Sequence, residues 1–265
     1  MQLLFQIKYQ QQSFISTLFR QSTAVYLQSK MSTTSTLPHC PFRAIILDID
    51  GTLIDSNDAH ARAFEQAFHD CGHIYPYEDI RRLIGMGGDN LLPHLSNIKP
   101  DSVEGEEINN KKKEYFSQEM KSLKPQPGAK ELVKALHDRG FLLGISSSCK
   151  ASELGEFLEL IGIEKRYLDA CTTSDDIDSS KPDPDAVQAT LKKLKVDPEE
   201  AVMIGDTPYD VESAGKSGVK TIIFRCGGYW SDKNFPTALA LYDSPQDLLN
   251  RMADSPLAGS PAPSS

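Results

Sequence analysis

Two aspartates spaced by one residue are the strongest candidates for chemistry in this sequence. Asp48 and Asp50 follow the apolar run 44–47. Such a run predicts a buried parallel strand that carries its polar residues to the carboxyl edge of a sheet, where open α/β sheets bind ligands. Strand geometry places both carboxylates on one side. One can attack phosphorus to form an aspartyl-phosphate, while the other protonates the leaving oxygen and then deprotonates water.

An Asp-Gly turn in a β-hairpin is the alternative interpretation of this stretch. A hairpin would require a second strand directly after Gly51, whereas residues 58–68 have helical spacing. The pattern therefore favours a strand followed by a turn into a helix.

Later apolar segments also end in polar residues. Ser146 follows one of them, Lys181 precedes a helix, and Asp206 and Asp210 follow another strand. In a parallel sheet all of them converge at one edge. Taken singly, each has an ordinary explanation: a loop serine, a Lys-Pro helix entrance, a helix cap, and a first-turn aspartate.

Taken together, these residues suit phosphoryl transfer. Asp48 and Asp206 beside an anionic phosphate would repel one another unless a hard divalent cation lies between them, and Mg²⁺ is the natural choice. The Ser146 hydroxyl and the Lys181 ammonium would hold phosphate oxygens as charge spreads in the transition state.

The elements that position these residues alternate between helix and strand. We expect helices near 128–139, 151–161 and 184–195, and strands near 141–145, 201–204 and 219–224. This alternation predicts an α/β fold, a parallel sheet with helices on both faces. An insertion of mostly helical residues follows the first strand and is long enough to be a small domain lying over the carboxyl edge as a lid. The expected organisation is a leader at 1–42, a core at 43–56 and 125–252, a cap at 57–124 and a disordered tail at 253–265.

Composition limits the function classes. The chain has 265 residues, 39% hydrophobic and 25% charged, and its formal net charge of -9 argues against a general nucleic-acid binder. Five scattered cysteines favour a reducing compartment without a structural zinc site. The apolar positions of the leader are too interrupted for a membrane span.

Residues 1–43 lack acidic side chains, which suits a mitochondrial transit peptide. Translation from Met31, or a merely disordered leader, explains the same composition. We expect a cytoplasmic protein, with a mitochondrial location as the alternative if 1–30 is a transit peptide. The Pro/Ser/Ala-rich tail predicts disorder.

These motifs, in their order along the chain, resemble the haloacid dehalogenase superfamily of phosphatases over about 43–250. They are Asp48-Ile-Asp50-Gly51-Thr52-Leu53, then Ser146, then Lys181-Pro182, then Gly205-Asp206-x-x-x-Asp210. The resemblance implies a Rossmann-like core. The helical insertion looks like the cap of the phosphoglycolate phosphatase and β-phosphoglucomutase branch.

The resemblance also implies roles for individual residues. Asp48 would be the nucleophile and Asp50 the general acid/base. Ser146, Ser147 and Lys181 would bind the phosphoryl group. Mg²⁺ would be held by the side chains of Asp48 and Asp206 and the backbone carbonyl of Asp50, with Asp210 supporting the metal site.

Substrate choice is expected to come from the cap, through residues His60, Arg82, Gly85, Gly87 and Gly88. The glycines resemble the specificity loop of the family, because they permit close backbone approach to a ligand. The alternative is a helix that ends in a flexible connector. Either Arg81 or Arg82 would contact a second anionic group, unless the pair is solvated. The lysine run 111–113 predicts a solvated helix face.

We therefore predict a Mg²⁺-dependent phosphatase that hydrolyses a small phosphorylated metabolite of the phosphoglycolate or sugar phosphate type. The alternatives are a phosphosugar mutase of the β-phosphoglucomutase type and a non-catalytic phospho-ligand binding protein. Asp50 argues against dehalogenation, and Gly205, where mutases usually carry an acid, favours hydrolysis. The substrate and the oligomeric state stay open.

Overall fold

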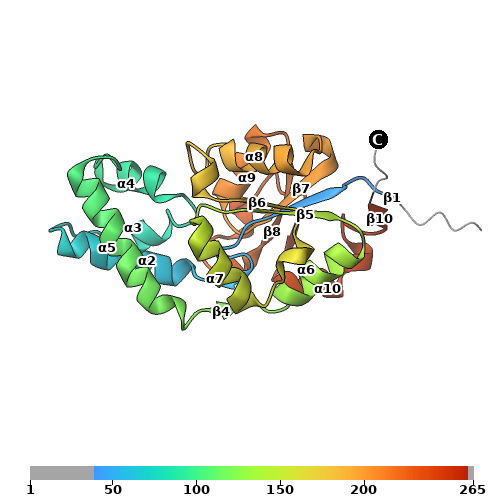
Figure 1. Cartoon of the computed structure of the whole chain (residues 1–265), viewed down its shortest axis with the longest axis horizontal. Coiled ribbons are helices and arrows are strands. Elements are labelled where there is room, and N and C mark those ends of the chain that lie inside the picture. The colour runs from blue at the N-terminus through green and yellow to red at the C-terminus, as the bar shows by residue number, and fades with distance from the viewer. Residues whose placement is uncertain (1–38, 262–265) are drawn as a thin grey trace, which may run out of the picture. The chain divides into compact units, whose positions relative to one another are not determined.

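A parallel sheet of six strands, in the order β6-β5-β2-β7-β8-β9, forms the centre of the fold (Figure 1). The computed structural model describes residues 39–261. The strands are β2 (Ala44–Leu47), β5 (Leu142–Ser146), β6 (Ala170–Thr172), β7 (Ala201–Gly205), β8 (Lys220–Phe224) and β9 (Ala240–Tyr242). All neighbouring pairs in this sheet are parallel. The sheet confirms the predicted α/β class.

Helices cover both faces of the sheet. On one face lie α6 (Ala129–Asp138), α7 (Ala151–Ile161) and α10 (Pro245–Asn250), and on the other lie α8 (Asp185–Leu194) and α9 (Pro208–Lys216) (Figure 1). Short 3-10 helices occur in the connections: η1 (Lys165–Tyr167), η2 (Ser174–Asp176), η3 (Pro198–Glu200), η4 (Arg225–Gly227), η5 (Asp232–Asn234) and η6 (Met252–Asp254).

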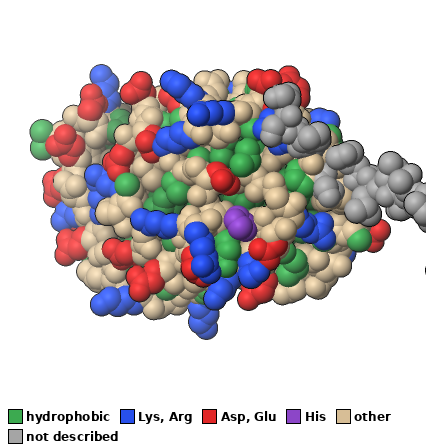
Figure 2. Space-filling view, turned by 45° about the vertical axis from the view of Figure 1, so that its right-hand side comes forward, with side chains coloured by type: hydrophobic (Ala, Val, Ile, Leu, Met, Phe, Trp, Pro, Cys, Tyr) green, Lys and Arg blue, Asp and Glu red, His purple; other side chains and the backbone are tan. Residues whose placement is uncertain are grey.

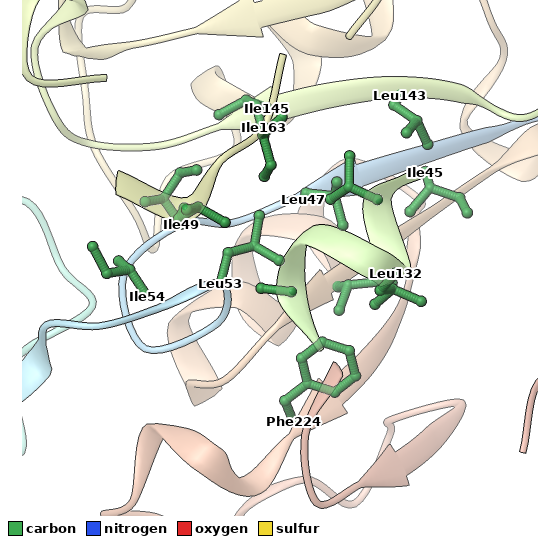
Figure 3. Close-up of a cluster of buried hydrophobic side chains, with 14 of the residues drawn as sticks. Ile45, Leu47, Ile49, Leu53, Ile54, Leu132, Leu143, Ile145, Ile163 and Phe224 are labelled. Carbon is green, nitrogen blue, oxygen red and sulfur yellow. The ribbon is translucent and has the colours of Figure 1, made fainter. Parts of the chain in front are cut away.

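The side chains of β2 alternate between the two faces. Ile45 and Leu47 pack with Leu132 of α6 and with Phe224 at the end of β8 (Figure 3). Ala44 and Ile46 join the cluster under α8 and α9. Each large aliphatic side chain buried in this way stabilises the fold by about 1.5–3 kcal/mol. Because β2 is buried on both faces, it reads in the sequence as an uninterrupted apolar run.

A separate group of helices forms the cap, with its own hydrophobic cluster. It consists of α2 (Asn57–Asp70), α3 (Tyr77–Arg81), α4 (Gly88–Ser96) and α5 (Val103–Met120). The two crossings between core and cap pair as the antiparallel strands β3 (Ile54–Asp55) and β4 (Lys124–Pro125). This pairing holds the entry and exit of the cap side by side.

The two ends of the described chain differ from the expected disorder. β1 (His39–Cys40) pairs in parallel with β10 (Ser260–Pro261), and Leu257 is fully buried. Disorder is therefore the wrong description for 253–261, because apolar residues of the tail fill a hydrophobic site on the core. Residues 39–42, assigned to the leader, join the same core through the buried Phe42. The remaining leader and tail predictions, including the transit peptide, lie outside the described residues.

The surface carries charges of both signs. Figure 2 shows Lys and Arg side chains interspersed with Asp and Glu side chains over one face. Within 39–261, no helix combines the length and the apolar character needed to cross a membrane. All five cysteines carry free thiols.

Candidate active site

The site lies where the strand order reverses. From β2 the chain moves outward to β5 and β6, and then returns to β7 on the other side of β2. Asp48 directly follows β2, and its backbone N–H donates to the carbonyl of Ile204 in β7 (3.0 Å). This hydrogen bond continues the pairing of β2 with β7 and so fixes the position of Asp48. Open α/β sheets bind ligands at such a point, where the strand order reverses.

Three buried carboxylates converge at this edge. Asp48, Asp206 and Asp210 each offer an oxygen, and these oxygens lie within 4.8 Å of one another. Asp206 follows β7, and Asp210 lies in the first turn of α9. The structure thus brings together three of the acidic residues that the sequence singled out.

Asp210 has two roles in the structure. Its Oδ2 atom accepts hydrogen bonds from the N–H groups of Asp206 (3.2 Å) and Thr207 (2.9 Å), so it forms the capping box that begins α9. The Oδ1 atom lies 2.8 Å from Nζ of Lys181. The first-turn interpretation of Asp210 is therefore correct and is compatible with a role in the site, whereas the N-cap of α9 is Thr207 rather than Asp206.

Lys181 is almost completely buried between two carboxylates. Its Nζ forms ion pairs with Asp48 and with Asp210. Burial acts to lower the pKa of Lys181, but the charges of Asp210 and Asp48 outweigh burial and raise this pKa above its ordinary value. The ammonium is consequently retained at neutral pH.

One ammonium does not balance the negative charge of this cluster. Burial raises the pKa of Asp48 to about 7, against the opposing charge of Lys181. Burial, followed by repulsion from Asp210 and Asp48, raises the pKa of Asp206 well above its ordinary value. The Thr52 hydroxyl lies 3.1 Å from Asp48 Oδ2 and 3.0 Å from Asp206 Oδ1, yet it has one hydrogen to donate. An all-oxygen donor set with excess negative charge fits a hard divalent cation.

The Asp206 carboxylate sits between two glycines. A Cβ on Gly51 or Gly227 would lie 2.2 Å or 1.9 Å from its Oδ2 atom, so a side chain at either position would displace the carboxylate. Asn57, the first residue of α2, donates from Nδ2 to the same oxygen (2.8 Å). Sequence reasoning missed Asn57, because a polar residue at a helix start is ordinary.

Asp50 faces the cap rather than the carboxylate cluster. Its Oδ1 accepts hydrogen bonds from the Ser56 hydroxyl and from Nε2 of His60 (2.9 Å). Burial, and then the charge of Lys112, lower the pKa of His60. Burial acts to raise the pKa of Asp50, but His60 and Ser56 outweigh it and lower this pKa. Asp50 is therefore ionised while it accepts these hydrogen bonds.

A cavity of about 350 Å³ separates the cap from the carboxylates. From the core it is lined by Asp48, Asp50 and Lys181, and from the cap by His60, Gly85, Gly87, Gly88 and Lys112, among others. Its volume lies at the small end of the range for small-molecule sites. The structure thus places most of the predicted catalytic and cap residues around one space.

The two predicted phosphate-binding serines lie outside the lining of this cavity. Ser146 ends β5 and Ser147 follows it, both fully buried. The Ser147 hydroxyl accepts the N–H of Cys149 (3.2 Å), and the Ser146 hydroxyl has no hydrogen-bond partner among the described residues. The next residue, Ser148, does line the cavity. Phosphate binding by Ser146 and Ser147 stays a prediction.

The predicted solvation of the lysine run is wrong for Lys112. This side chain lines the cavity, and its Nζ lies 5.3 Å and 4.8 Å from the ring centroids of Phe64 and Phe116. Burial lowers the pKa of Lys112. The spacing contained the signal, because Lys112 stands four residues after Ile108 and four before Phe116, both buried on one helix face.

Neither arginine of the 81–82 pair lines the cavity, contrary to the expectation for Arg82. The Arg82 side chain is half exposed and lies 3.7 Å from Asp79. Arg81 is buried, and its Nε donates to Asp58 (2.6 Å) while its guanidinium also donates to the carbonyl of Gly227. Both arginines pair with protein groups, and Lys112 is among the cationic side chains that line the cavity from the cap.

Comparison with known proteins agrees with this geometry. Residues 45–224 match the family described as haloacid dehalogenase-like hydrolase. The pyrophosphatase PpaX of Bacillus pumilus is 31% identical over 79% of this chain and 93% of its own length. The phosphoglycolate phosphatase of Aquifex aeolicus is 31% identical over 79% of this chain and 96% of its length.

A solved structure shows the same fold. The crystal structure of a hydrolase from Pseudomonas syringae is 28% identical, with a TM-score of 0.74, and the match covers 80% of this chain and 98% of that one. The fold, the carboxylate cluster and these relatives lead to one conclusion. The chain is a phosphatase that belongs to the haloacid dehalogenase-like hydrolase family.

Proposed function

We propose that this protein is a Mg²⁺-dependent phosphatase that hydrolyses a small phosphorylated metabolite through an aspartyl-phosphate on Asp48. The proposal is carried by the convergence of Asp48, Asp206 and Asp210 on one point beside Lys181, where Asp48 and Lys181 line the cavity under the cap. The proposed nucleophile, the proposed cation ligands and the ammonium of Lys181 would then all lie within reach of one phosphoryl group.

The carboxylates of Asp48 and Asp206, supported by Asp210, would hold Mg²⁺, together with the backbone carbonyl of Asp50. When bound, the cation neutralises phosphate charge and orients the phosphoryl group. Asn57 and the two glycines at 51 and 227 hold the Asp206 carboxylate in place for this role.

In the first half of the reaction, an oxygen of the ionised Asp48 attacks phosphorus and the bond to the leaving oxygen breaks. The Lys181 ammonium stabilises both the ionised nucleophile and the charge on the phosphoryl oxygens. Asp50 takes up a proton as the substrate dianion approaches, because a neighbouring negative charge raises a carboxyl pKa, and delivers this proton to the leaving oxygen.

In the second half, Asp50 deprotonates a water that attacks phosphorus and releases Asp48 as the free carboxylate. The hydrogen bonds from Ser56 and His60 favour the ionised form of Asp50 that this step requires.

The cavity supports a small substrate with a polar or anionic leaving group. Lys112 supplies an ammonium on the cap side, and no ion pair engages it within 39–261. Pyrophosphate and phosphoglycolate, the compounds named for the two relatives, are both small and anionic, and both are candidates. Gly205 stands where the mutases usually carry an acid, which supports hydrolysis over mutase activity; a Cβ there would lie 2.4 Å from Cγ of Asp210, so the present site leaves no room for such a side chain.

Phosphate release from a panel of phosphorylated metabolites, with Mg²⁺ and with EDTA, tests the proposal. We expect release from at least one small anionic substrate, and its loss in EDTA. Conversion of a sugar phosphate to its isomer without loss of organic phosphate would show a mutase. Phosphate binding without turnover across the panel would show a binding protein.

We also propose a cytoplasmic location, which the five free thiols support. The mitochondrial alternative depends on residues 1–30, which lie outside the described residues. Imaging of the full chain with a C-terminal fluorescent tag separates the two, because a mitochondrial signal that is lost when 1–30 is removed would reject the cytoplasmic proposal.

A further inference from the structure

The glycine loop of the cap packs against the core as closely as its backbone allows. A Cβ on Gly87 would lie 2.3 Å from both Cβ and Oγ of Ser180, and a Cβ on Gly85 would lie 2.7 Å from Cγ2 of Thr207. Real side chains do not tolerate such distances, so glycine at these two positions permits the approach. The loop therefore meets the core at the two segments that carry Lys181 and Asp210.

Two side chains that follow these glycines bind the backbone around Lys181. Asp89 Oδ2 accepts the N–H of Ser180 (2.9 Å). Asn90 Nδ2 donates to the carbonyls of Ser180 (2.9 Å) and Lys181 (3.2 Å). Three main-chain polar groups at the phosphate-binding lysine thus find their partners on the cap. Buried backbone groups need such partners, so these contacts constrain the path of 180–181.

The direction of the Lys181 side chain depends on this path. Its Nζ contacts Asp48 and Asp210 on the core, while its own carbonyl is held from the cap. Separation of cap and core would leave Ser180 and Lys181 without these three hydrogen bonds. The ammonium would then be free to move away from the nucleophile.

We propose that Asp89 and Asn90 are positioning residues, which fix the backbone of 180–181 when the cap closes and so place the Lys181 ammonium against Asp48. The proposal rests on the proposed role of Lys181 in phosphoryl transfer. It makes the glycine loop a docking loop for the core, in addition to its place in the cavity wall. Closure of the cap then completes the catalytic site as well as excluding water.

A specificity role makes a different prediction from a positioning role. Lys181 would contact the phosphoryl group, which all substrates share, so loss of its positioning must weaken turnover of every substrate by the same factor. Replacement of a residue that contacts the leaving group would instead lower turnover of some substrates more than others. Inhibition by inorganic phosphate separates the two cases, because phosphate has no leaving group.

The experiment compares Asn90→Ala, Asn90→Asp and Asp89→Ala with the wild-type full chain. Asn90→Asp keeps the size of the side chain but replaces the donor amide by an acceptor. Asn110→Ala and Asp101→Ala are matched controls, because both residues are exposed in the cap. We measure kcat and KM on three substrates with different leaving groups, inhibition by inorganic phosphate, melting temperature, and amide hydrogen exchange at Ser180.

We expect kcat/KM to fall by about tenfold for each altered residue, the scale of one hydrogen bond to a charged or buried group, and by the same factor on all three substrates. Phosphate inhibition weakens in parallel, Ser180 exchanges faster, and the controls stay within about twofold of the wild type. Unchanged activity, or losses that differ between substrates with phosphate inhibition intact, would overturn the proposal.

A wild-type protein without phosphatase activity would reject the proposed function instead. In that case hydrogen exchange still tests the docking contact, because it needs no turnover. Unchanged Ser180 exchange in all three variants would overturn the docking contact itself.

Discussion

Asn57 connects the cap to the proposed metal site through a single hydrogen bond. It begins α2, donates to the carboxylate of Asp206, and is 2% exposed. Partners that orient a metal ligand commonly contribute 10–100-fold to metal affinity, because the ligand otherwise rotates away from the ion. The first turn of the cap helix thereby helps to set the geometry of the core carboxylates.

We predict that Asn57→Ala lowers Mg²⁺ affinity by about tenfold. The free Asp206 carboxylate would rotate, and its buried oxygen would lose a donor. Isothermal titration calorimetry with Mg²⁺ measures the change without any substrate. Asn110→Ala, which alters an exposed asparagine, is the control. Mg²⁺ affinity equal to that of the wild type would contradict this role.

Lys112 is the cap residue that we propose as the partner of an anionic leaving group. Its ammonium faces the cavity over the rings of Phe64 and Phe116. We predict that Lys112→Met lowers kcat/KM by about tenfold for substrates with a second anionic group, because a partly buried ion pair is lost, and by much less for substrates with a neutral leaving group. Lys111→Met is the control, since Lys111 pairs with Glu107 on the surface. Equal losses on both substrate types would contradict the prediction.

The loop between α3 and α4 is the segment that we propose to dock the cap on the core. We predict that Gly87→Ala prevents full closure, because its Cβ would lie 2.3 Å from Cβ of Ser180. Turnover should fall by about tenfold or more while the melting temperature changes little, since misplacement by about 1 Å costs up to 10²-fold in rate. Steady-state kinetics and calorimetry check both parts.

Gly155→Ala is the matched control for that variant. A Cβ at this position in α7 meets no atom within 4 Å. Alanine is favoured over glycine inside a helix by about 0.5–1 kcal/mol, so this variant should keep full activity and gain stability. A fully active Gly87→Ala enzyme would show that the cap can close with a methyl group between residue 87 and Ser180, which would contradict the prediction.

The strands that carry the site could be predicted from the sequence, whereas the short strands β3, β4 and β9 could not. Strands buried on both faces leave an apolar run ended by polar residues, and β2 and β7 both have this form. β9 is short, and β3 and β4 pair across the whole cap insertion, so no local signal marks them. The inward position of Lys112 was predictable in principle, because its spacing places it on the face of α5 that carries the buried Ile108 and Phe116.

The two ends of the described chain meet on the core. The tail buries Leu257 completely, and Cys40 donates to the carbonyl of Pro256 (3.4 Å). The Pro/Ser/Ala composition of the tail did not predict this contact. One or two apolar residues that fit a hydrophobic site on the core are enough to order a short segment, and composition does not report them. We expect the packing of these two ends on the core to contribute to the stability of the fold rather than to catalysis.

We predict that Leu257→Ala lowers the free energy of unfolding by about 2–5 kcal/mol, through lost burial and the cavity left behind. Leu239→Ala should change it by about 0.5 kcal/mol or less, because Leu239 is 37% exposed. Urea denaturation of both variants provides the comparison. Similar small changes in both would mean that the tail does not pack as the structure has it.

We propose Asp48 as the nucleophile of a Mg²⁺-dependent phosphatase. Asp48→Asn keeps the shape of the side chain but removes its nucleophilic charge, so the fold should persist while turnover is lost. The most direct measurement is phosphate release by wild type and Asp48→Asn on the preferred substrate with saturating Mg²⁺, beside their melting temperatures. We predict a loss of at least about 10³-fold in kcat with the fold intact. A folded Asp48→Asn protein with wild-type turnover would show that Asp48 is not the nucleophile.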